Sequence, residues 1–233
     1  YLRRDVQRLV NQDRNVFSAC MLKFGDADGM VSGVTRHFMN TLSDIRLVLD
    51  EAEAGQLMGL SIAITRGRTL VVADTNVTEF REAEDLAAIA EGAAKAARKM
   101  GLTPRVAFMS YSTFGNPPGS RTEKVQSAVE ILDRRGADFE YEGEMAVDVA
   151  LNPHHHELYG FSRLSDAANV LVMPAVHSAS ISTRLLKAAG GATVIEGLLI
   201  GLEKSVQVAR LGASVSDIVN LAGLASFDLT HRE

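Results

Sequence analysis

Short apolar segments that are typical of buried strands alternate with helical patterns along this chain, and this alternation constrains the fold more than any other feature. "RVAFMSY" (105–111) and "NVLVMPA" (169–175) are two such segments, and a stretch of helical periodicity follows each of them. Strands that alternate with helices favour a parallel sheet wrapped by helices. We therefore predict an α/β fold of mostly parallel sheets flanked by helices.

Three helices are predicted from their periodicity and their ends. The segment 82–100 carries apolar residues at helical spacing, so one of its faces should pack on the sheet. Ser120 and Glu123 stand three residues apart before an apolar periodic run, which is the spacing of a capping box. Ser214 and Asp217 repeat that spacing near the end of the chain. We expect helices to begin at these two serines.

The loop between the predicted strand 105–111 and the helix predicted from Ser120 could hold an anion. Residues 112–123 contain hydroxyl groups at Ser112, Thr113 and Ser120, and their backbone N–H groups can converge at a helix N-terminus. No phosphate-binding motif of the GxxxxGK[ST] or GxGxxG type is present. An ordinary connection stiffened by two prolines explains the same residues, so the loop alone does not decide between the two interpretations.

Metal binding is weakly supported. The three histidines 154–156 are adjacent and cannot all face one ion, so we favour a solvated loop there. Asp26 and Asp28 could form a metal pair, but the further ligands of a calcium loop are missing and carboxylates at such places also cap turns. We predict no metal site in this chain.

His177 and Ser178 follow the strand at 169–175 and precede a helix. Ligand sites gather at the carboxyl ends of parallel strands, which makes this position a candidate. A side chain that hydrogen-bonds into the turn is the alternative for His177.

Charge and cysteine content narrow the class of protein. The formal net charge of −5 is spread along the chain without long like-charge runs, so the sequence predicts neither nucleic-acid binding nor an anionic membrane surface as a partner. Cys20 is the one cysteine, which excludes a disulfide framework and fits a reducing compartment. No apolar stretch approaches the roughly 18 residues of a membrane helix. We expect a cytoplasmic protein without a membrane partner.

Two lobes are expected, near 1–110 and 111–233, with a cleft between them. The polar stretches 51–56 and 152–157 are the candidate boundaries, because few contacts cross such segments. The chain starts at Tyr1, inside a helical pattern, and we interpret it as a fragment of a longer chain.

Several spaced segments together resemble a known family. "GDADGMVSGVT", "VVADTNV", "SYSTFG", "NVLVMPAVHSASIS" and "LGASVSDIVNLAGLA", in this order, resemble the phosphate acetyl/butyryltransferase family between about Gly25 and Ala225. More narrowly, "NVFSACM", "STFGNPPGSR", "FEYEGEMAVDVALN" and "MPAVHSASIS" resemble the phosphotransacetylase-like C-terminal domain of bacterial hybrid NADP-dependent malic enzymes.

The resemblance implies two α/β lobes, dimerisation, and transfer of an acetyl group between acetyl phosphate and coenzyme A. Active transferases carry a Ser-Arg pair directly before the glycine that corresponds to Gly212, and an acid at the position of Asp217. Here the pair reads Arg210-Leu211, so the hydroxyl is lost and the guanidinium has moved by one residue. Thr75 is a second departure, because many members have cysteine there. Asp217 could act as a base towards a thiol, but helix capping explains it without catalysis.

We therefore expect a domain that binds acetyl-CoA as an allosteric inhibitor and forms oligomers, in a malic enzyme that converts malate to pyruvate and CO2. Its transferase activity would be lost, and NADP and a divalent metal would belong to upstream domains in cis rather than to this chain. An active phosphate acyltransferase and a dimerisation scaffold without a ligand are the alternatives. The candidate binding residues are Ser112, Thr113, Ser120, Arg121, His177, Ser178, Arg210 and Asp217, with Arg36 as a further cation.

Overall fold

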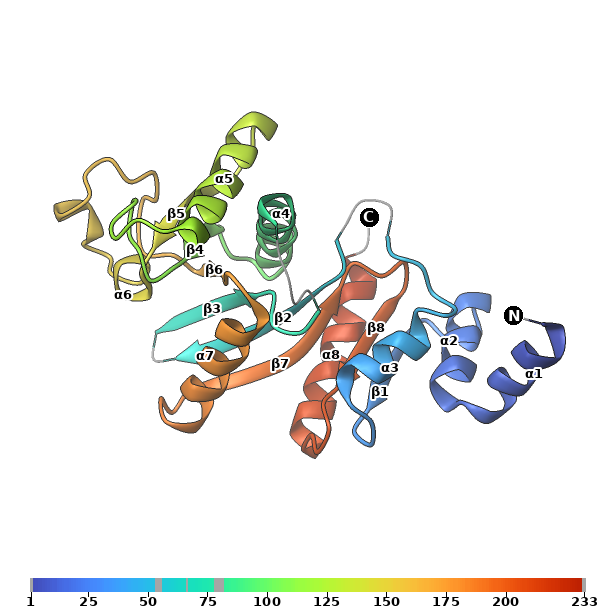
Figure 1. Ribbon diagram of the computed structural model, residues 1–233. Helices are drawn as coiled ribbons and strands as arrows, with labels where there is room; N and C mark the ends of the chain where they lie inside the picture. Colours follow the sequence, from blue (N-terminus) through green and yellow to red (C-terminus); the bar gives the residue numbers. More distant parts are fainter. Residues whose placement is uncertain (1, 53–55, 66, 78–81, 232–233) are drawn as a thin grey trace. The chain divides into compact units, whose positions relative to one another are not determined.

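A computed structural model describes residues 2–52, 56–65, 67–77 and 82–231 (Figure 1). Helices and strands alternate along most of it, as expected. The helices are α1 (Arg3–Gln12), α2 (Arg14–Phe24), α3 (Phe38–Ile45), α4 (Ala83–Lys99), α5 (Ser120–Arg135), α6 (Val147–Ala150), η1 (His155–Glu157), α7 (Val176–Ala188) and α8 (Val215–Thr230). The strands are β1 (Gly29–Gly33), β2 (Met58–Thr65), β3 (Arg68–Ala73), β4 (Arg105–Met109), β5 (Glu140–Met145), β6 (Val170–Val172), β7 (Thr193–Ile200) and β8 (Ser205–Ala209).

The chain divides into two compact units, which differ from the halves expected near residue 110. The terminal unit comprises Tyr1–Gly59 and Ile195–Glu233, and the central unit comprises Leu60–Val194. The terminal unit is discontinuous in sequence because β1 pairs in parallel with β8, close to the other end of the chain. The stretch 51–56 does lie near a unit boundary, whereas 152–157 lies inside the central unit.

The central unit is built on a sheet in which the strands β5, β4, β6, β3 and β2 are neighbours in that order. The pairs β4·β5, β4·β6 and β3·β6 are parallel, and the hairpin β2·β3 is antiparallel. Helices α4 and α5 contact each other and lie over β3 to β5, while α7 lies below β3 in Figure 1. This arrangement confirms the predicted mostly parallel α/β fold.

The predicted helix 82–100 is confirmed, and its sequence explains its bounds. Glu82 is the N-cap of α4 and forms a capping box with Asp85, which satisfies two backbone N–H groups at the helix start. The face that carries Leu86, Ile89 and Ala93 is fully buried. Because α4 is covered on that face, it forms one layer of the central unit.

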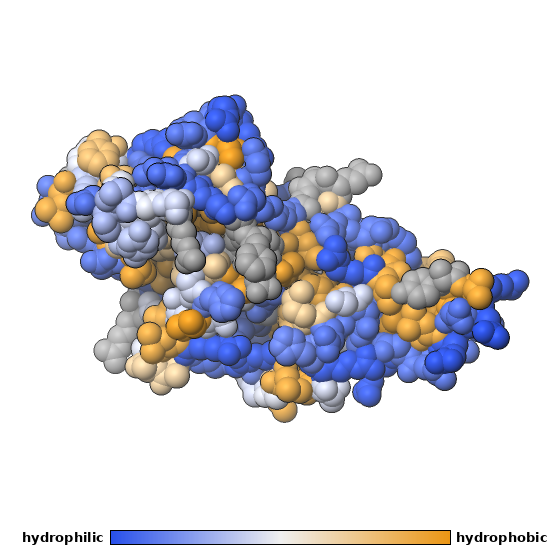
Figure 2. Space-filling view, in the orientation of Figure 1, coloured by the Kyte–Doolittle hydropathy of each residue, from blue (hydrophilic) through white to orange (hydrophobic). Residues whose placement is uncertain are grey.

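The outward face of α5 is polar, and Figure 2 shows this part of the surface in blue. The inward face carries Val125, Ala128, Val129 and Leu132, all buried. This alternation at helical spacing is the pattern of a helix with one face on a core.

In the terminal unit, α8 packs on the parallel pair β1·β8, and α2 and α3 contact β1. Leu221 and Ala225 are the buried residues of α8. Ser205 on β8 donates a hydrogen bond to the carbonyl of Ala225 (2.9 Å), which ties the strand to the helix. No helix in the described part of the chain is both long and apolar enough to cross a membrane.

Candidate functional site

The carboxyl ends of β3, β4 and β6 lie at the same end of the central sheet, because these strands are parallel neighbours. Most predicted site residues lie in the segments that follow them. After β3, the carboxylate of Asp74 accepts hydrogen bonds from the backbone N–H groups of Asn76 (3.0 Å) and Val77 (3.1 Å). Thr75, where many family members have cysteine, is buried and accepts a bond from the hydroxyl of Ser61 (3.3 Å).

A buried carboxylate organises the loop after β4. Oε1 of Glu144, at the end of β5, accepts hydrogen bonds from the hydroxyl of Ser112 (2.7 Å) and from the backbone N–H of Gly115 (2.7 Å). The N–H of Phe114 donates to the Glu144 carbonyl (2.9 Å). The hydroxyl of Ser112 is therefore directed at a buried carboxyl group inside the protein. Sequence reasoning missed Glu144, which lies in a segment that the sequence analysis did not assign to a strand.

Glu144 carries an unusual feature on its other oxygen. The side chain is fully buried, yet Oε2 has no hydrogen-bond partner among the described residues. Thr113 supports the same contact between strand and loop, because its hydroxyl oxygen accepts a bond from the N–H of Ala146 (3.1 Å). Ser112 and Thr113, two of the three residues whose hydroxyl groups were predicted to face an anion, thus have structural partners within the protein.

The helix after this loop begins at Ser120, as predicted, but without the predicted capping box. Gly119, not Ser120, is the N-cap of α5, and no side chain caps it. The carbonyl of Gly119 accepts the first helical bonds from Thr122 (2.9 Å) and Glu123 (3.2 Å), so the predicted capping box of Ser120 with Glu123 is wrong. A Cβ at Gly119 would lie 2.5 Å from the hydroxyl of Tyr111, so a larger residue there would displace this exposed side chain. Ser120 is exposed, and the side chain of Arg121 lies outside the described residues.

The start of α7 is the second candidate at this edge of the sheet. Its N-cap is Ala175, which offers no capping side chain, so the first backbone N–H groups of α7 point outward with the positive end of the helix dipole. His177 is exposed there, and the hydroxyl of Ser178 donates to the carbonyl of Ala175 (2.7 Å). This end of α7 is open to an anion, and ligand binding by His177 stays a prediction.

Of the three adjacent histidines, His155 is buried, whereas His154 is exposed. His155 is only 1% exposed, and its two ring nitrogens contact the carbonyl of Asn152 (2.9 Å) and the hydroxyl of Ser162 (3.1 Å). The expectation of a solvated loop is therefore wrong for His155. The turn sequence Asn152-Pro153 was the signal in the sequence for His155, because the imidazole ring contacts the carbonyl of Asn152 in that turn. No group of three or more His, Cys, Asp or Glu side chains in the described ranges is placed to hold a metal ion.

The terminal unit contains a pocket of about 310 Å³ at the carboxyl ends of β1 and β8. Gly33 and Ala209, the last residues of these parallel strands, are paired partners. A Cβ at Gly33 would lie 2.0 Å from the carbonyl oxygen of Ala209, so only glycine allows the strands this approach. The pocket is lined by Arg14, Ser18, Val31, Ser32, Gly33, Val34, Ala209 and Ile218.

Arg14 is the cation of this pocket, and sequence reasoning missed it. It is the exposed first residue of α2, which Asp13 caps through bonds to the N–H groups of Asn15 (2.8 Å) and Val16 (3.2 Å). The capping aspartate before an apolar helical run was a signal that could have placed Arg14 at a helix start. Its position at the carboxyl ends of two parallel strands is where α/β proteins bind ligands.

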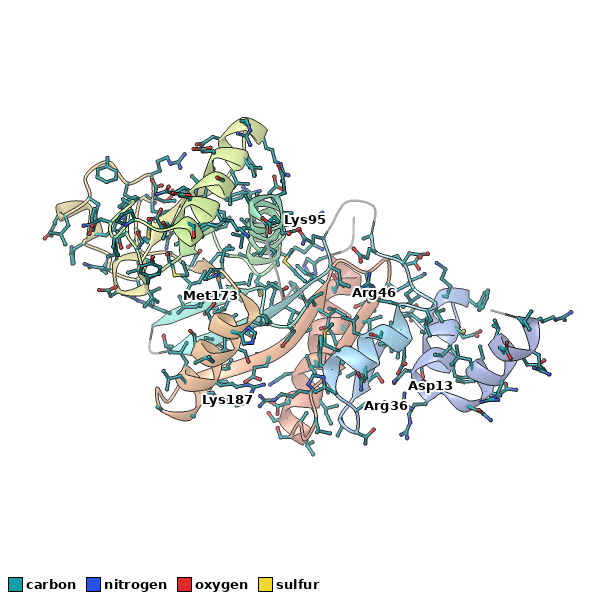
Figure 3. The ribbon with its side chains drawn as sticks, in the orientation of Figure 1. Asp13, Arg36, Arg46, Lys95, Met173 and Lys187 are labelled. Atoms are coloured by element: carbon teal, nitrogen blue, oxygen red, sulfur yellow. The ribbon has the colours of Figure 1, made fainter. Side chains whose placement is uncertain are left out.

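Arg36 does not lie free for a ligand. Its guanidinium donates to the carboxylates of Asp13 (2.5 Å) and Asp44 (2.8 Å), and Figure 3 labels Asp13 and Arg36. Burial raises the pKa of Asp13, but the hydrogen bonds from Arg36 and from the amides of Val16 and Asn15 outweigh burial and lower this pKa below its usual value. Arg36 therefore holds α2 and α3 together.

Arg210 and Leu211 stand where the sequence comparison places the Ser-Arg pair of active transferases. The guanidinium of Arg210 donates to the carboxylate of Glu196, whose side chain is only 13% exposed. Leu211 is 64% exposed and has no polar atom in its side chain. The guanidinium of Arg210 is thus paired with Glu196, and the side chain at position 211 has no hydrogen-bond donor.

Asp217 caps α8, as expected from the spacing of Ser214 and Asp217. Its Oδ2 accepts bonds from the Ser214 N–H (2.9 Å) and hydroxyl (2.8 Å), and the Asp217 N–H donates to the Ser214 hydroxyl oxygen (3.2 Å). The predicted capping box is confirmed.

The comparisons with known proteins decide the family. The model of the family described as phosphate acetyl/butaryl transferase matches residues 1–226. The chain belongs to this family. A phosphotransacetylase from Streptococcus pyogenes has the same fold: it superposes with a TM-score of 0.86 at 27% identity, over 94% of this chain and 68% of that chain. A phosphate acetyltransferase of Corynebacterium glutamicum is 30% identical over 95% of this chain and 68% of its own length.

Malic enzymes are also among the relatives of this member of the family. The NADP-dependent malic enzyme of Rhizobium meliloti (strain 1021) is 57% identical over 228 residues, which are 98% of this chain and 30% of the relative. The chain thus spans about a third of the length of the malic enzymes that it matches. The resemblance predicted from the sequence segments, to the transferase family and to its malic enzyme branch, is confirmed.

Proposed function

We propose that this chain is the regulatory domain of an NADP-dependent malic enzyme, where it binds acetyl-CoA and no longer transfers the acetyl group. The observation that carries the proposal is the ion pair of Arg210 with Glu196 beside the apolar side chain of Leu211. These two residues stand where active transferases of the family have Ser-Arg. The 57% identity to a malic enzyme supports the choice of parent protein.

Loss of transfer follows from the charges that acyl transfer needs. Transfer from an acyl phosphate needs donors and positive charge fixed where negative charge develops, and loss of one such donor costs about 2.7 to 4 kcal/mol. Glu196 neutralises the guanidinium of Arg210, and Leu211 supplies no donor from its side chain. Two weakened contributions of this size would slow the reaction by several orders of magnitude.

Retained binding is supported by two features that do not depend on the lost pair. The pocket of the terminal unit keeps about 310 Å³ and the guanidinium of Arg14, which suits an anionic group of an acyl-CoA. The uncapped N-terminus of α7 in the central unit offers backbone N–H groups beside His177.

Two measurements on the chain test the proposal. Isothermal titration should give saturable binding of acetyl-CoA, with free coenzyme A as the comparison, and Arg14→Ala should weaken it about tenfold, or 1.4 kcal/mol. The matched control is Arg134→Ala, an exposed arginine on α5 far from this pocket in the sequence. An assay of acetyl-CoA formation from acetyl phosphate and coenzyme A should show no rate above background.

The alternative is an active transferase. The 30% identity to a phosphate acetyltransferase over nearly the whole chain supports this alternative. A measurable rate in the assay would establish it and contradict our proposal. The double variant Arg210→Ser, Leu211→Arg restores the family's pair and releases Glu196. We expect this variant to gain transferase activity. Absence of any acetyl-CoA binding by the unmodified chain would instead support a dimerisation scaffold.

Regulation is tested in the parent protein. Acetyl-CoA should lower the rate of NADP-dependent malate decarboxylation, with a coupling free energy of about 1 to 3 kcal/mol between the two sites. Arg14→Ala should shift the inhibition to higher acetyl-CoA without changing the uninhibited rate. Self-association, which the family resemblance predicts, is measured by sedimentation velocity of the same samples. Inhibition that is identical in the variant would contradict the assignment of this pocket.

A further inference from the structure

A second cavity, of about 340 Å³, lies at the amino ends of β3, β4 and β6 in the central unit. The cavity therefore lies at the opposite end of these strands from the loop 110–119 and the start of α7. The proposed function makes no use of it. It is lined by Gly67, Arg68, Thr69, Leu70, Leu102, Arg105, Pro153, Asp166, Ala167, Ala168 and Asn169.

Strand register places two arginines on the same face of the sheet. Val71 of β3 and Val106 of β4 both pair with Val170 of β6. Alternate residues of a strand share a face, so Arg68 lies on the face of Leu70 and Val72, and Arg105 on the face of Ala107 and Met109. Those four apolar residues belong to one buried cluster. The two arginines therefore stand at the end of that cluster, on strands separated by β6 alone.

A single backbone carbonyl orients each guanidinium. Nη1 of Arg68 donates to the carbonyl of Leu151 (2.6 Å), and Nε of Arg105 donates to the carbonyl of Ala167 (2.8 Å). A guanidinium has five N–H donors in a rigid fork, so one anchoring bond fixes its direction and leaves further donors for a ligand.

The charge balance of the cavity is positive. Asp166 is the acidic residue of the lining, and its carboxylate lies 3.9 Å from Nη2 of Arg105, beyond hydrogen-bond distance. The side chain of Asp166 is 55% exposed, whereas that of Arg105 is 23% exposed. Water screens the exposed carboxylate more than the recessed guanidinium, so an anion that enters the cavity is attracted.

We propose that this cavity binds a small dianion, a phosphate group or a short dicarboxylate, between Arg68 and Arg105. Planar guanidinium forks recognise both chemistries through paired hydrogen bonds. A volume near 340 Å³ is at the lower end for small-molecule pockets and suits such a compact ligand. Leu70, Leu102 and Pro153 supply an apolar wall for the carbon skeleton of a dicarboxylate or phosphate ester.

The test is isothermal titration of the chain at low salt with inorganic phosphate and, separately, with succinate. We expect saturable binding of at least one probe, weakened about tenfold or more (1.4 kcal/mol) by Arg68→Ala and by Arg105→Gln. Arg134→Ala, the exposed control on α5, should leave it unchanged. Asp166→Asn keeps both arginines and removes the competing charge, so it should tighten binding, and it remains informative if an arginine variant fails to fold. Circular dichroism melts check the fold of each variant.

Two further variants distinguish this cavity from other anion sites. Phosphate binding that is lost in Arg14→Ala or Ser112→Ala, yet kept in Arg68→Ala and Arg105→Gln, overturns the inference. No saturable heat from either probe overturns it as well. Titration of acetyl-CoA into Arg68→Ala should give the affinity of the unmodified chain. If acetyl-CoA fails to bind while the Arg68-dependent anion binding persists, the proposed function fails and this inference stands.

Discussion

Tyr141 links ionisation to stability at the scale of a single residue. Its phenol is buried and donates a hydrogen bond to Oδ1 of Asp133 (2.6 Å). Burial and the adjacent Asp133 carboxylate raise the pKa of Tyr141 from 10.0 to about 12. Below the unfolded pKa both states are protonated and the stabilisation is fully present. As pH rises through the interval from 10.0 to about 12, the unfolded state loses the proton first and the stabilisation is lost.

We expect Tyr141→Phe to lower the free energy of unfolding by about 1 kcal/mol near neutral pH, because one hydrogen bond is lost. The same change should flatten the decline of stability in the alkaline interval. Urea unfolding at a series of pH values measures both effects. The exposed Tyr111 provides the control as Tyr111→Phe. An unchanged alkaline slope in Tyr141→Phe would show that another group causes the decline.

Ser112 makes a second prediction at this scale. Ser112→Ala removes one of the two donors that Oε1 of Glu144 holds, and Glu144 has no solvent to replace it. We expect a loss of about 1 to 3 kcal/mol in the free energy of unfolding. Ser120→Ala, at an exposed position of the same segment, should stay within about 0.5 kcal/mol. Equal effects of the two changes would contradict the role of Glu144 as organiser of the loop.

At the scale of elements, the close approach of β1 and β8 is the feature most sensitive to substitution. Gly33 has φ +110 and would bring a Cβ to 2.0 Å from the Ala209 carbonyl oxygen. Gly33→Ala should therefore cost more than about 3 kcal/mol, since backbone must shift as well as adopt a strained conformation. Gly25→Ala is the matched control, because its φ of +86 is also positive but nothing lies within 4 Å. It should cost about 1 to 2 kcal/mol.

Thermal and urea unfolding of both glycine variants measure the difference. Acetyl-CoA binding should fall in Gly33→Ala and persist in Gly25→Ala, because Gly33 lines the pocket. Similar stability of the two variants would mean that β1 and β8 separate easily and that their contact does not shape the pocket.

At the scale of the whole molecule, ligand binding should appear as added stability. Acetyl-CoA at 100 times its dissociation constant stabilises the native state by about 2.7 kcal/mol. For a chain of 233 residues this corresponds to a rise in Tm of roughly 5 to 10 °C. Differential scanning calorimetry checks this, with Arg14→Ala at the same ligand concentration as the control. A shift of equal size in the variant would place the ligand elsewhere.

Patterns that are local in sequence were sufficient to predict many of the helices and strands of this protein. The alternation of strands and helices, the apolar face of α4 and the capping box of Ser214 with Asp217 depend on residues a few positions apart, so periodicity and spacing predict them. The family was predictable because its segments occur in a fixed order. The capping box predicted for Ser120 and Glu123 was wrong because Gly119 occupies the N-cap position of α5, so the spacing of two polar residues was not sufficient to identify a cap.

Only the tertiary structure decided which charged and polar groups stay available for a ligand. Ser112 and Glu144 are 32 positions apart, and Arg210 and Glu196 are 14 apart, yet each pair is joined by the fold. The physical reason is that a buried carboxylate must find donors, and strand register determines which donors reach it. The fold leaves Arg14 at one pocket and places Arg68 and Arg105 at the lining of another. The sequence by itself determined the family and the local elements, and long-range packing determined where an anion can bind.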